Sequence, residues 1–438
     1  MLIYKVLRIL LLLPVVSVLS QAQATMIGSP LTGDVIRPRL ESEVQATNAL
    51  LGDLVVTAIA DDNNNNATVN PIGGSQYYFA PGIALQRTRP RLTWNIGYSP
   101  GLRLYLPGGV TPDQLTHILG GVLHWDLSRR LAVGLRQDYL RTNDPFQQFG
   151  EAPLQSNIGI LNRPSEFPIS NFRYSELFSE VESDYQLEKH TLVGVNGSFI
   201  QISPDQHQLR NQGSFITTRT TSGSAFVSHQ FTARQTFGVQ YQLLNMLFQG
   251  NSHTITQGVF VFDRLVISQH TTFTLFAGPQ YSHIHNQEAV TSQSVVVPVP
   301  QSETLWSPAG GAMLSWGRDR TAFYADLTRR VNAGLGLLSS VEMTEASLDV
   351  QRKVTDRWIV NVSGQINDET LLSTASTDHI LLSHIDAGIS REFSRDTHLR
   401  LAYQRIRQSG NYLYPFGLGN HNRFLVTFER RFAWPVGR

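Results

Sequence analysis

The sequence predicts an all-β protein whose strands form an antiparallel, up-and-down β-barrel of about 16 to 18 strands. Two observations support this prediction. Apolar and polar residues alternate with a period of two along most of the chain after residue 50, and the alternating segments are joined by connections that are short and long in turn. Charged residues make up 16% of the chain, against about 25% in typical soluble proteins. Helical periodicity is scarce.

The N-terminus has the features of a secretory signal peptide, residues 1–24. Lys5 and Arg8 form a positive region, Ile9 to Leu19 form an apolar core, and Ala22-Gln23-Ala24 is a small-residue cleavage site. The apolar run is about half of the roughly 20 residues that a spanning helix needs. We therefore expect an exported protein whose first 24 residues are removed.

Residues 25–50 follow as a polar periplasmic N-terminal extension, and residues 51–434 are the predicted barrel. The extension could instead dock the barrel to a periplasmic partner or plug it. Later apolar runs such as Val259 to Ile267 are short and contain charges, here Asp263 and Arg264, so no helix is predicted to span the membrane.

The composition excludes several classes of function. The chain has no cysteine, which excludes a disulfide scaffold, a Cys-ligated metal, a thiol nucleophile and a lipid-anchored cysteine. The formal net charge is +1, which does not favour a nucleic-acid partner.

Three segments illustrate the alternation. Arg357 to Asn367 places Val and Ile on one face and Asn, Ser and Gln on the other, and Glu345 to Gln351 alternates in the same way. Thr272 to Tyr281 follows the pattern with one exception, because Phe276 falls on the polar face. Each segment predicts a strand with one apolar and one wet face.

The connections predict how the strands are joined. The eight candidate turns are Arg87 to Pro90, Ser128 to Arg130, Glu188 to His190, Thr232 to Gln235, Gln269-His270, Gly317 to Arg320, Thr355 to Arg357 and Ser394 to Thr397. The nine candidate loops are Asp62 to Ser75, Ser99 to Asp113, Asn143 to Phe172, Ser203 to Gly213, Gln249 to His253, His285 to Ser302, Asn332 to Ser340, Asp368 to Thr377 and Gln408 to His421. Seventeen connections imply 18 strands, from near Asp53 to near Phe432, or 16 if one pair is misassigned.

Tight turns at one end and longer loops at the other are typical of a transmembrane barrel of the bacterial outer membrane. Lipid offers the backbone no hydrogen-bond partner, so the sheet has to close. Large aromatic residues fall near the predicted strand ends, as interfacial girdles require. They are Trp94, Tyr105, Trp125, Tyr139, Trp306, Trp316, Trp358 and Trp434.

Repeated turn motifs carry a resemblance to a known family. The segments Leu127-Ser128-Arg129-Arg130-Leu131 and Val354-Thr355-Asp356-Arg357-Trp358 each join two alternating strands through a turn with Ser or Thr and Arg. With Ala58 to Asn64 and Phe79 to Gly82, they make the chain similar to the outer-membrane β-barrel porins of Gram-negative bacteria. The resemblance covers most of the chain from about residue 50. It implies localisation in the cell outer membrane, with outer-membrane lipid as a partner.

The last predicted strand resembles the aromatic C-terminal strands that the barrel assembly machinery recognises. Phe424, Val426, Phe428 and Phe432 alternate along it. The chain departs from the family pattern in two ways, because Arg430 interrupts the series and further residues follow Phe432. The resemblance nevertheless implies this machinery as a partner.

Alternation also predicts which side chains line the lumen, since barrels of this size enclose water. The predicted lumen-lining residues are Asp326, Arg330, Glu345, Asp349, Asn361, Gln365, His384, Asp386 and Glu392. Because they carry both signs of charge, we expect weak charge selectivity. The loops Asn143 to Phe172 and His285 to Ser302 are the candidates to narrow the channel.

The sequence predicts no catalytic residue, no metal site and no cofactor. His283 and His285 could share a strand face but have no evident third ligand, and Asp61 to Asn66 lacks the spacing of an EF-hand. There is no G-x-S-x-G motif. A surface hydrolase needs only a Ser, a His and a polar residue on neighbouring strands, so it is kept as a less favoured alternative.

We therefore predict a non-enzymatic outer-membrane channel or porin for passive diffusion of small solutes. The main alternative is an accessory or structural barrel in export of a surface polysaccharide, working with a periplasmic export component. A second alternative is an exported soluble β-protein, in which another sheet would bury the outward apolar faces.

Overall fold

The structure of the chain is a computed structural model. It describes residues 48–63, 70–106, 114–142, 174–204, 217–248, 252–292, 295–333, 340–372, 379–410 and 420–436. The predicted signal peptide and nearly all of the predicted extension therefore lie outside the described residues. Within the described residues, no helix is long and apolar enough to span a membrane.

The described residues form eighteen strands, as the alternation predicts. They are β1 (Asn48–Asp61), β2 (Gly74–Arg89), β3 (Leu92–Leu106), β4 (Gln114–Asp126), β5 (Leu131–Thr142), β6 (Tyr174–Glu188), β7 (Thr191–Pro204), β8 (Thr218–Thr232), β9 (Gln235–Phe248), β10 (His253–Ser268), β11 (Thr271–Ser292), β12 (Val295–Arg318), β13 (Thr321–Ala333), β14 (Ser340–Thr355), β15 (Trp358–Leu371), β16 (His379–Ser394), β17 (Thr397–Gly410) and β18 (His421–Pro435).

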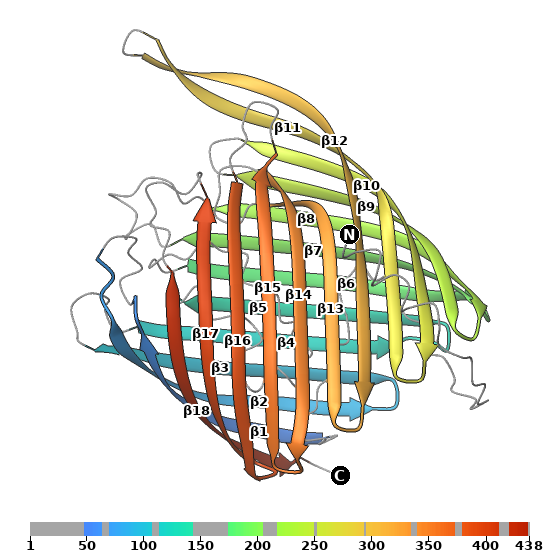
Figure 1. The fold of residues 1–438 in the computed structure, drawn as a ribbon. Helices are drawn as coiled ribbons and strands as arrows, with labels where there is room; N and C mark the ends of the chain where they lie inside the picture. The colour runs from blue at the N-terminus through green and yellow to red at the C-terminus, as the bar shows by residue number, and fades with distance from the viewer. Residues whose placement is uncertain are drawn as a thin grey trace, which may run out of the picture.

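All eighteen strands belong to one antiparallel sheet in which each pairs with its neighbours along the chain. The sheet closes because β1 pairs with β18 from Ala49↔Pro435 to Asp61↔Arg423. In Figure 1 the strands of the front wall cross those of the back wall, as the strands of a tilted, closed barrel do. The predicted fold class is confirmed, with the larger of the two strand numbers.

The two ends of the barrel differ in their connections. At one end, the turn end, eight connections of two to four residues join β2 to β3, β4 to β5 and so on to β16 and β17. The other end, the loop end, carries connections of up to 31 residues, the longest between β5 and β6. The eight predicted turns all fall at the turn end, so the predicted topology is confirmed.

The predicted loop His285 to Ser302 is wrong. The ladder between β11 and β12 continues to Ser292↔Val295, so nearly all of this segment is strand. The hairpin projects beyond its neighbours (Figure 1). Val296, Val297 and Val299 are β-branched residues that favour extended backbone, although two prolines interrupt the run and indicate a loop. The other candidate to narrow the channel, Asn143 to Phe172, lies outside the described residues.

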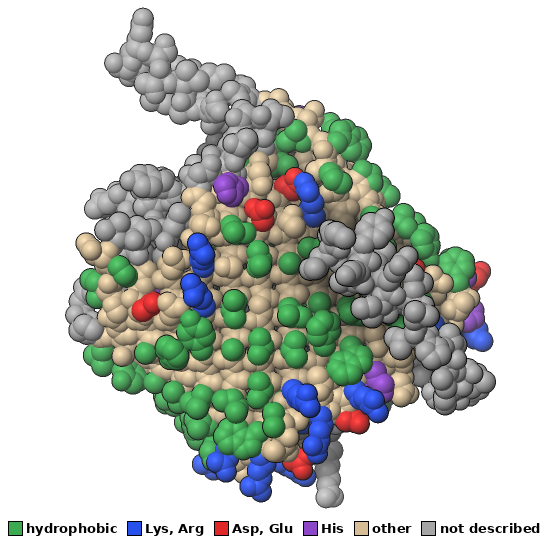
Figure 2. Space-filling model, in the orientation of Figure 1, with side chains coloured by type: hydrophobic (Ala, Val, Ile, Leu, Met, Phe, Trp, Pro, Cys, Tyr) green, Lys and Arg blue, Asp and Glu red, His purple; other side chains and the backbone are tan. Residues whose placement is uncertain are grey.

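The outer face of the barrel is apolar between two polar or aromatic rims. Figure 2 shows hydrophobic side chains over the front strands and basic side chains gathered at the turn end. Many large apolar side chains are exposed on this face, for example Ile366 at 52% and Val426 at 46%. No second sheet covers them within the described residues, whose strands all belong to one sheet. This is the surface that a lipid bilayer buries.

Aromatic residues lie at both rims of the outer face. Five of the six tryptophans are at the turn end, and the sixth, Trp306, is at the loop end, where it is 71% exposed and contacts Tyr281. At the turn end Arg391 stacks over Trp358, with 5.3 Å from the guanidinium carbon to the ring centre. One predicted girdle residue is misplaced, because Tyr105 is 7% exposed and points to the inner face.

Candidate functional site

The inner face of the barrel is the candidate site, and all nine predicted lumen residues lie on it. On β15, Val362 and Ile366 are 43% and 52% exposed on the outer face, whereas Asn361 and Gln365 occupy the alternate positions. The strand pairing carries this alternation to the neighbouring strands. It places Asp326 and Arg330 of β13, Glu345 and Asp349 of β14, and His384, Asp386 and Glu392 of β16 on the same side. That they line a solute path stays a prediction.

Asp386 is the centre of a hydrogen-bonded group on β15, β16 and β17. Its Oδ1 accepts from Asn361 Nδ2 at 3.0 Å and from Arg400 Nη2 at 2.5 Å, and its Oδ2 accepts from Gln404 Nε2 at 3.0 Å. The carboxylate is 4% exposed. A buried carboxylate requires such partners. Its negative charge is therefore largely neutralised by Arg400.

The other predicted residues fall into smaller groups. Ser347 donates a hydrogen bond to Asp326, and Gln365 Nε2 donates to Glu345 Oε1 at 3.3 Å. Glu392 lies 4.0 Å from His398 on β17. Six of the nine thus contact partners on neighbouring strands, in separate small groups rather than in one constellation.

The closure of β1 onto β18 holds a charged group that the sequence did not predict. Asp61 Oδ1 lies 3.0 Å from His421 Nδ1, and Asp61 Oδ2 lies 3.5 Å from Arg423 Nε. All three side chains are almost fully buried. Asp61 is about 360 residues from the other two along the chain. Only the alternation of β18 could therefore have indicated that Arg423 points inward.

A second group outside the prediction lies on β5 to β7. Arg136 Nε donates to Asp138 Oδ2 at 2.7 Å, and Asn196 Nδ2 donates to Glu180 Oε1 at 2.7 Å. Together with the groups above, these residues give the inner face from β13 through β18 and β1 to β7 its charged and amide side chains, although apolar residues such as Leu51 and Leu140 also lie there. We call this the polar sector.

The remaining part of the inner face, on β7 to β12, carries an apolar cluster. Its buried members are Leu192, Phe226, Phe260, Phe262, Phe276 and Ala309, and Met313 packs against them. We call this the phenylalanine sector. Phe276, which broke the sequence pattern, is one of its members and lies 6.3 Å from Phe260, ring centre to ring centre.

Glycines on the same or neighbouring strands make room for these rings. A Cβ at Gly238 would lie 2.2 Å from Phe262 Cζ, and one at Gly194 would lie 2.3 Å from Phe226 Cε1. Real Cβ atoms do not approach so closely. The rings therefore occupy the space that a side chain at each glycine would need, and aromatic residues are known to cover glycine in sheets in this way. The sequence does show Gly and Phe residues at inward positions of these strands, which could have indicated an aromatic cluster. Only the strand register shows which glycine lies under which ring.

At the loop end, β13 and β14 lie against the inner face of β10 and β11. Thr254 of β10 and Ser340 of β14 share a hydrogen bond of 3.0 Å although three strands lie between them in the sheet. The backbone N–H of Val331 on β13 donates to Gln280 Oε1 on β11 at 3.0 Å. An apolar cluster spans the same place, formed by Met246, Phe248, Ile284, Val331 and Leu372, with Leu244 and Leu305 against it. The loop ends of β13 and β14 therefore pack inside those of β9 to β11.

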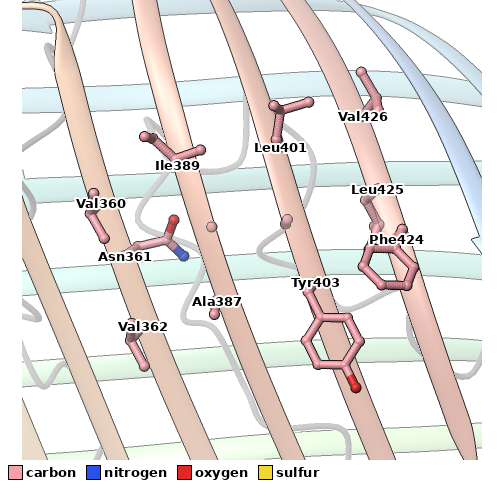
Figure 3. Close-up of a pocket in the computed structure, with 12 residues that line it drawn as sticks. Val360, Asn361, Val362, Ala387, Ile389, Leu401, Tyr403, Phe424, Leu425 and Val426 are labelled. Carbon is pink, nitrogen blue, oxygen red and sulfur yellow. The ribbon is translucent and has the colours of Figure 1, made fainter.

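A groove on β15 to β18 belongs to the outer face. Val362, Ala387, Tyr403 and Phe424 are among its lining residues. In Figure 3 these side chains point toward the viewer while the opposite wall runs behind them. The groove forms where the small Ala387 lies between larger apolar neighbours. Because Val362 and Phe424 are exposed on the outer face, the groove faces the surroundings of the barrel and not the lumen.

The two candidate ligand pairs from the sequence are placed elsewhere. His283 and His285 lie on the outer face at the loop end, where His283 Nε2 is 3.3 Å from Ser302 Oγ. Asp61 bonds His421 and Asp62 accepts from Asn422, so both carboxylates join β1 to β18. In the part of the chain that the structure describes, no three His, Cys, Asp or Glu side chains are grouped as metal ligands would be.

Comparison with known proteins gives matches among solved structures alone. No protein-family model matches the chain, and no curated protein matches it. The outer membrane protein OpdK of Pseudomonas aeruginosa is similar with a TM-score of 0.42 and 9% identity over 88% of this chain and 99% of that one. OccK2 (OpdF) of the same species has a TM-score of 0.43 and 9% identity over 88% and 98% of the two chains. The ferric-catecholate import receptor Fiu of E. coli K12 is similar with a TM-score of 0.46 and 8% identity over 90% of this chain and 82% of that one.

These similarities concern barrel architecture, and no residue role is transferred from them. The closed eighteen-stranded barrel with its short turns, long loops and aromatic rims is itself the architecture of outer-membrane β-barrel proteins. The resemblance to porins drawn from the turn motifs is confirmed at this level of fold.

Proposed function

We propose that the protein is an outer-membrane channel through which small solutes diffuse passively. The observation that carries the proposal is a closed barrel of 18 strands with a polar sector on its inner face and an apolar outer face. Barrels of 16 to 18 strands are wide enough to leave a water-filled lumen. Residues 1–24 would be removed on export, and the last strand would be recognised by the barrel assembly machinery.

The polar sector supports a weakly selective channel. Several of its charges occur in pairs of opposite sign, such as Asp386 with Arg400 and Asp138 with Arg136. A lumen attracts ions of one sign when one charge is in excess. Paired charges leave little excess, so we expect cations and anions to pass at similar rates. The proposal involves no catalytic step.

Recordings from single barrels in planar bilayers test this proposal. The refolded protein should produce conductance steps that are ohmic over moderate voltages, and a potassium chloride gradient should give a reversal potential near zero. A membrane in which folded protein produces no steps would contradict the proposal. Folding is checked beforehand by the change in gel mobility on boiling that barrels show.

The alternative role in export of a surface polysaccharide depends on a periplasmic partner for residues 25–50. Most of this segment lies outside the described residues, so the alternative stays a prediction from sequence. Deleting residues 27–45 separates the two roles. A channel keeps its conductance without the segment, whereas an export accessory loses surface polymer.

A further inference from the structure

Within the described residues, the join between β12 and β13 in the barrel wall is incomplete at the loop end. Their ladder ends at Gly310↔Arg329. On either side the pairing continues further, because β11 and β12 pair to Ser292↔Val295 and β13 and β14 pair to Ala333↔Ser340. Between Ser302 and Ala309 of β12, no strand pairs on the β13 side within the described residues. We call this break the seam.

A proline lies where the ladder stops. Pro308 has no backbone N–H and cannot donate to a ladder, so proline in a sheet is confined to edges and irregular positions. Pro279 on β11 is paired with it. The sequence therefore places two weak ladder positions side by side at the lower limit of the seam, and β12 becomes an edge strand above it.

Side chains close the seam from inside. The N–H of Val331, which would face β12 in a continued barrel, donates to Gln280 of β11 instead. The bond between Thr254 and Ser340 and the apolar contacts of Leu305 hold the loop ends of β13 and β14 against the inner face. Such side-chain contacts can separate without breaking a ladder of backbone hydrogen bonds.

The seam begins where β12 has crossed the bilayer. From Arg318 to Gly310 the strand has nine residues, and a tilted strand crosses the hydrocarbon in about 9 to 11. Trp306 and Tyr281 mark the outer interface on the same strands. Water and lipid headgroups at this depth can satisfy backbone groups that the hydrocarbon could not. The seam would therefore lead from the lumen to the outer leaflet.

The phenylalanine sector reaches the seam from the lumen side. Ala309 belongs to both, and Phe276 lies opposite Gly311 at the lower limit of the seam. No member of this cluster has an ionisable side chain. Asp184 of β6 lies beside Phe226, on the side of the cluster away from β12. The aromatic rings nearer the seam favour apolar and aromatic groups over ions.

We propose that the seam is a lateral opening through which small apolar solutes pass between the lumen and the outer leaflet. The inference deepens the proposed channel function and rests on it for access to the lumen. Ions and polar solutes would use the polar sector, whereas apolar solutes would pass over the phenylalanine sector and leave between β12 and β13.

A disulfide across the seam tests the proposal. The hydroxyl oxygens of Thr254 and Ser340 are 3.0 Å apart, so the double variant T254C/S340C brings two sulfurs within bonding reach. The matched control is T256C/S282C, whose hydroxyl oxygens are 2.9 Å apart at directly paired positions of β10 and β11. The natural chain has no cysteine, so each variant forms one defined bond.

Two measurements are made on each variant, oxidised and then reduced. The first is uptake of N-phenyl-1-naphthylamine, a neutral aromatic probe that fluoresces in apolar surroundings, by intact cells with and without the protein. The second is ion conductance in planar bilayers. We expect the wild-type protein to accelerate uptake, and the oxidised T254C/S340C variant to slow it roughly fivefold, because a covalent bond prevents the two walls from separating. Reduction should restore uptake, and conductance should stay unchanged.

The outcomes separate the two proposals. The proposal of a lateral opening is wrong if cells with the oxidised T254C/S340C variant take up the probe at the wild-type rate. It is also wrong if the wild-type protein adds nothing to uptake by host cells. If the oxidised control slows uptake equally, the effect is one of general stiffening and the inference also fails. A third outcome is that neither the wild-type protein nor the variants conduct ions, while the seam disulfide still slows probe uptake. This outcome would overturn the proposed channel for small solutes and leave the lateral opening in place.

Discussion

The two sectors of the inner face are built on different physical principles. In the polar sector, charges are paired across neighbouring strands, as the buried Asp386 is with the partly exposed Arg400. In the phenylalanine sector, rings from β8, β10 and β11 lie over glycine backbone and pack in one apolar cluster. Inward positions of one closed sheet therefore support both a sector with paired charges and a sector with an apolar cluster. Strand alternation decides only that a residue faces inward, and the neighbouring strands decide what it meets there.

The comparison predicts that the phenylalanine sector contributes more to stability per residue. Phe260 is 1% exposed, and truncating a buried Phe to Ala typically costs about 3–5 kcal/mol. Phe260→Ala should therefore lower the free energy of unfolding by an amount in this range, measured by urea unfolding of the vesicle-inserted protein. Val259→Ala is the control on the adjacent outer position and should cost much less. Equal losses would mean that the inner cluster is not a packed core.

A glycine under a ring should be nearly as sensitive as the ring itself. In Gly238→Val the new Cβ would meet Phe262 and the carbonyl oxygen of Val227, and overpacking of this kind costs about 1–3 kcal/mol. Gly223→Val is the matched control, because a Cβ at Gly223 has no atom within 4 Å. The two variants are compared by the same urea assay. A Gly238 variant as stable as the Gly223 variant would show that the ring moves aside freely.

The polar sector should respond more in ion selectivity than in stability. Asp386→Asn removes the negative partner of Arg400 and leaves one excess positive charge on the inner face. We expect the anion-to-cation permeability ratio to rise by about twofold, since one charge acts over a screening length of about 8–10 Å. The reversal potential in a potassium chloride gradient measures it. Asp263→Asn removes the same charge from the outer face and should leave the reversal potential unchanged.

The smallest expected effect concerns the closure of the polar sector. Thr57 and Thr427 share a hydrogen bond of 3.1 Å between β1 and β18, and a single bond of this type contributes about 0.5–1.5 kcal/mol. Thr57→Val and Thr427→Val should each lower the unfolding free energy by this amount. The double variant should cost less than the sum, because both changes remove the same bond. Additive losses would mean that the two hydroxyls act separately.

Local pattern was sufficient for much of the fold and part of the site. The period of two in β15 assigned Asn361 and Gln365 to the inner face, and the polar turns located the turn end. The same reading missed the phenylalanine sector, although Phe276 stood out as an exception, and took the β11–β12 hairpin for a loop. Prolines obscured that hairpin, whereas β-branched valines kept it extended.

The sequence by itself determined an up-and-down barrel of 16 to 18 strands, the end at which the turns lie and the face to which most strand side chains point. Each of these follows from neighbouring residues, because the side chains of a strand alternate with a strict period of two. Only the tertiary structure decided that Asp61 meets His421, that Phe262 lies over Gly238, and that Val331 bonds Gln280 across the seam. These contacts join residues far apart in the chain, and they depend on strand register and on how the wall curves at the loop end.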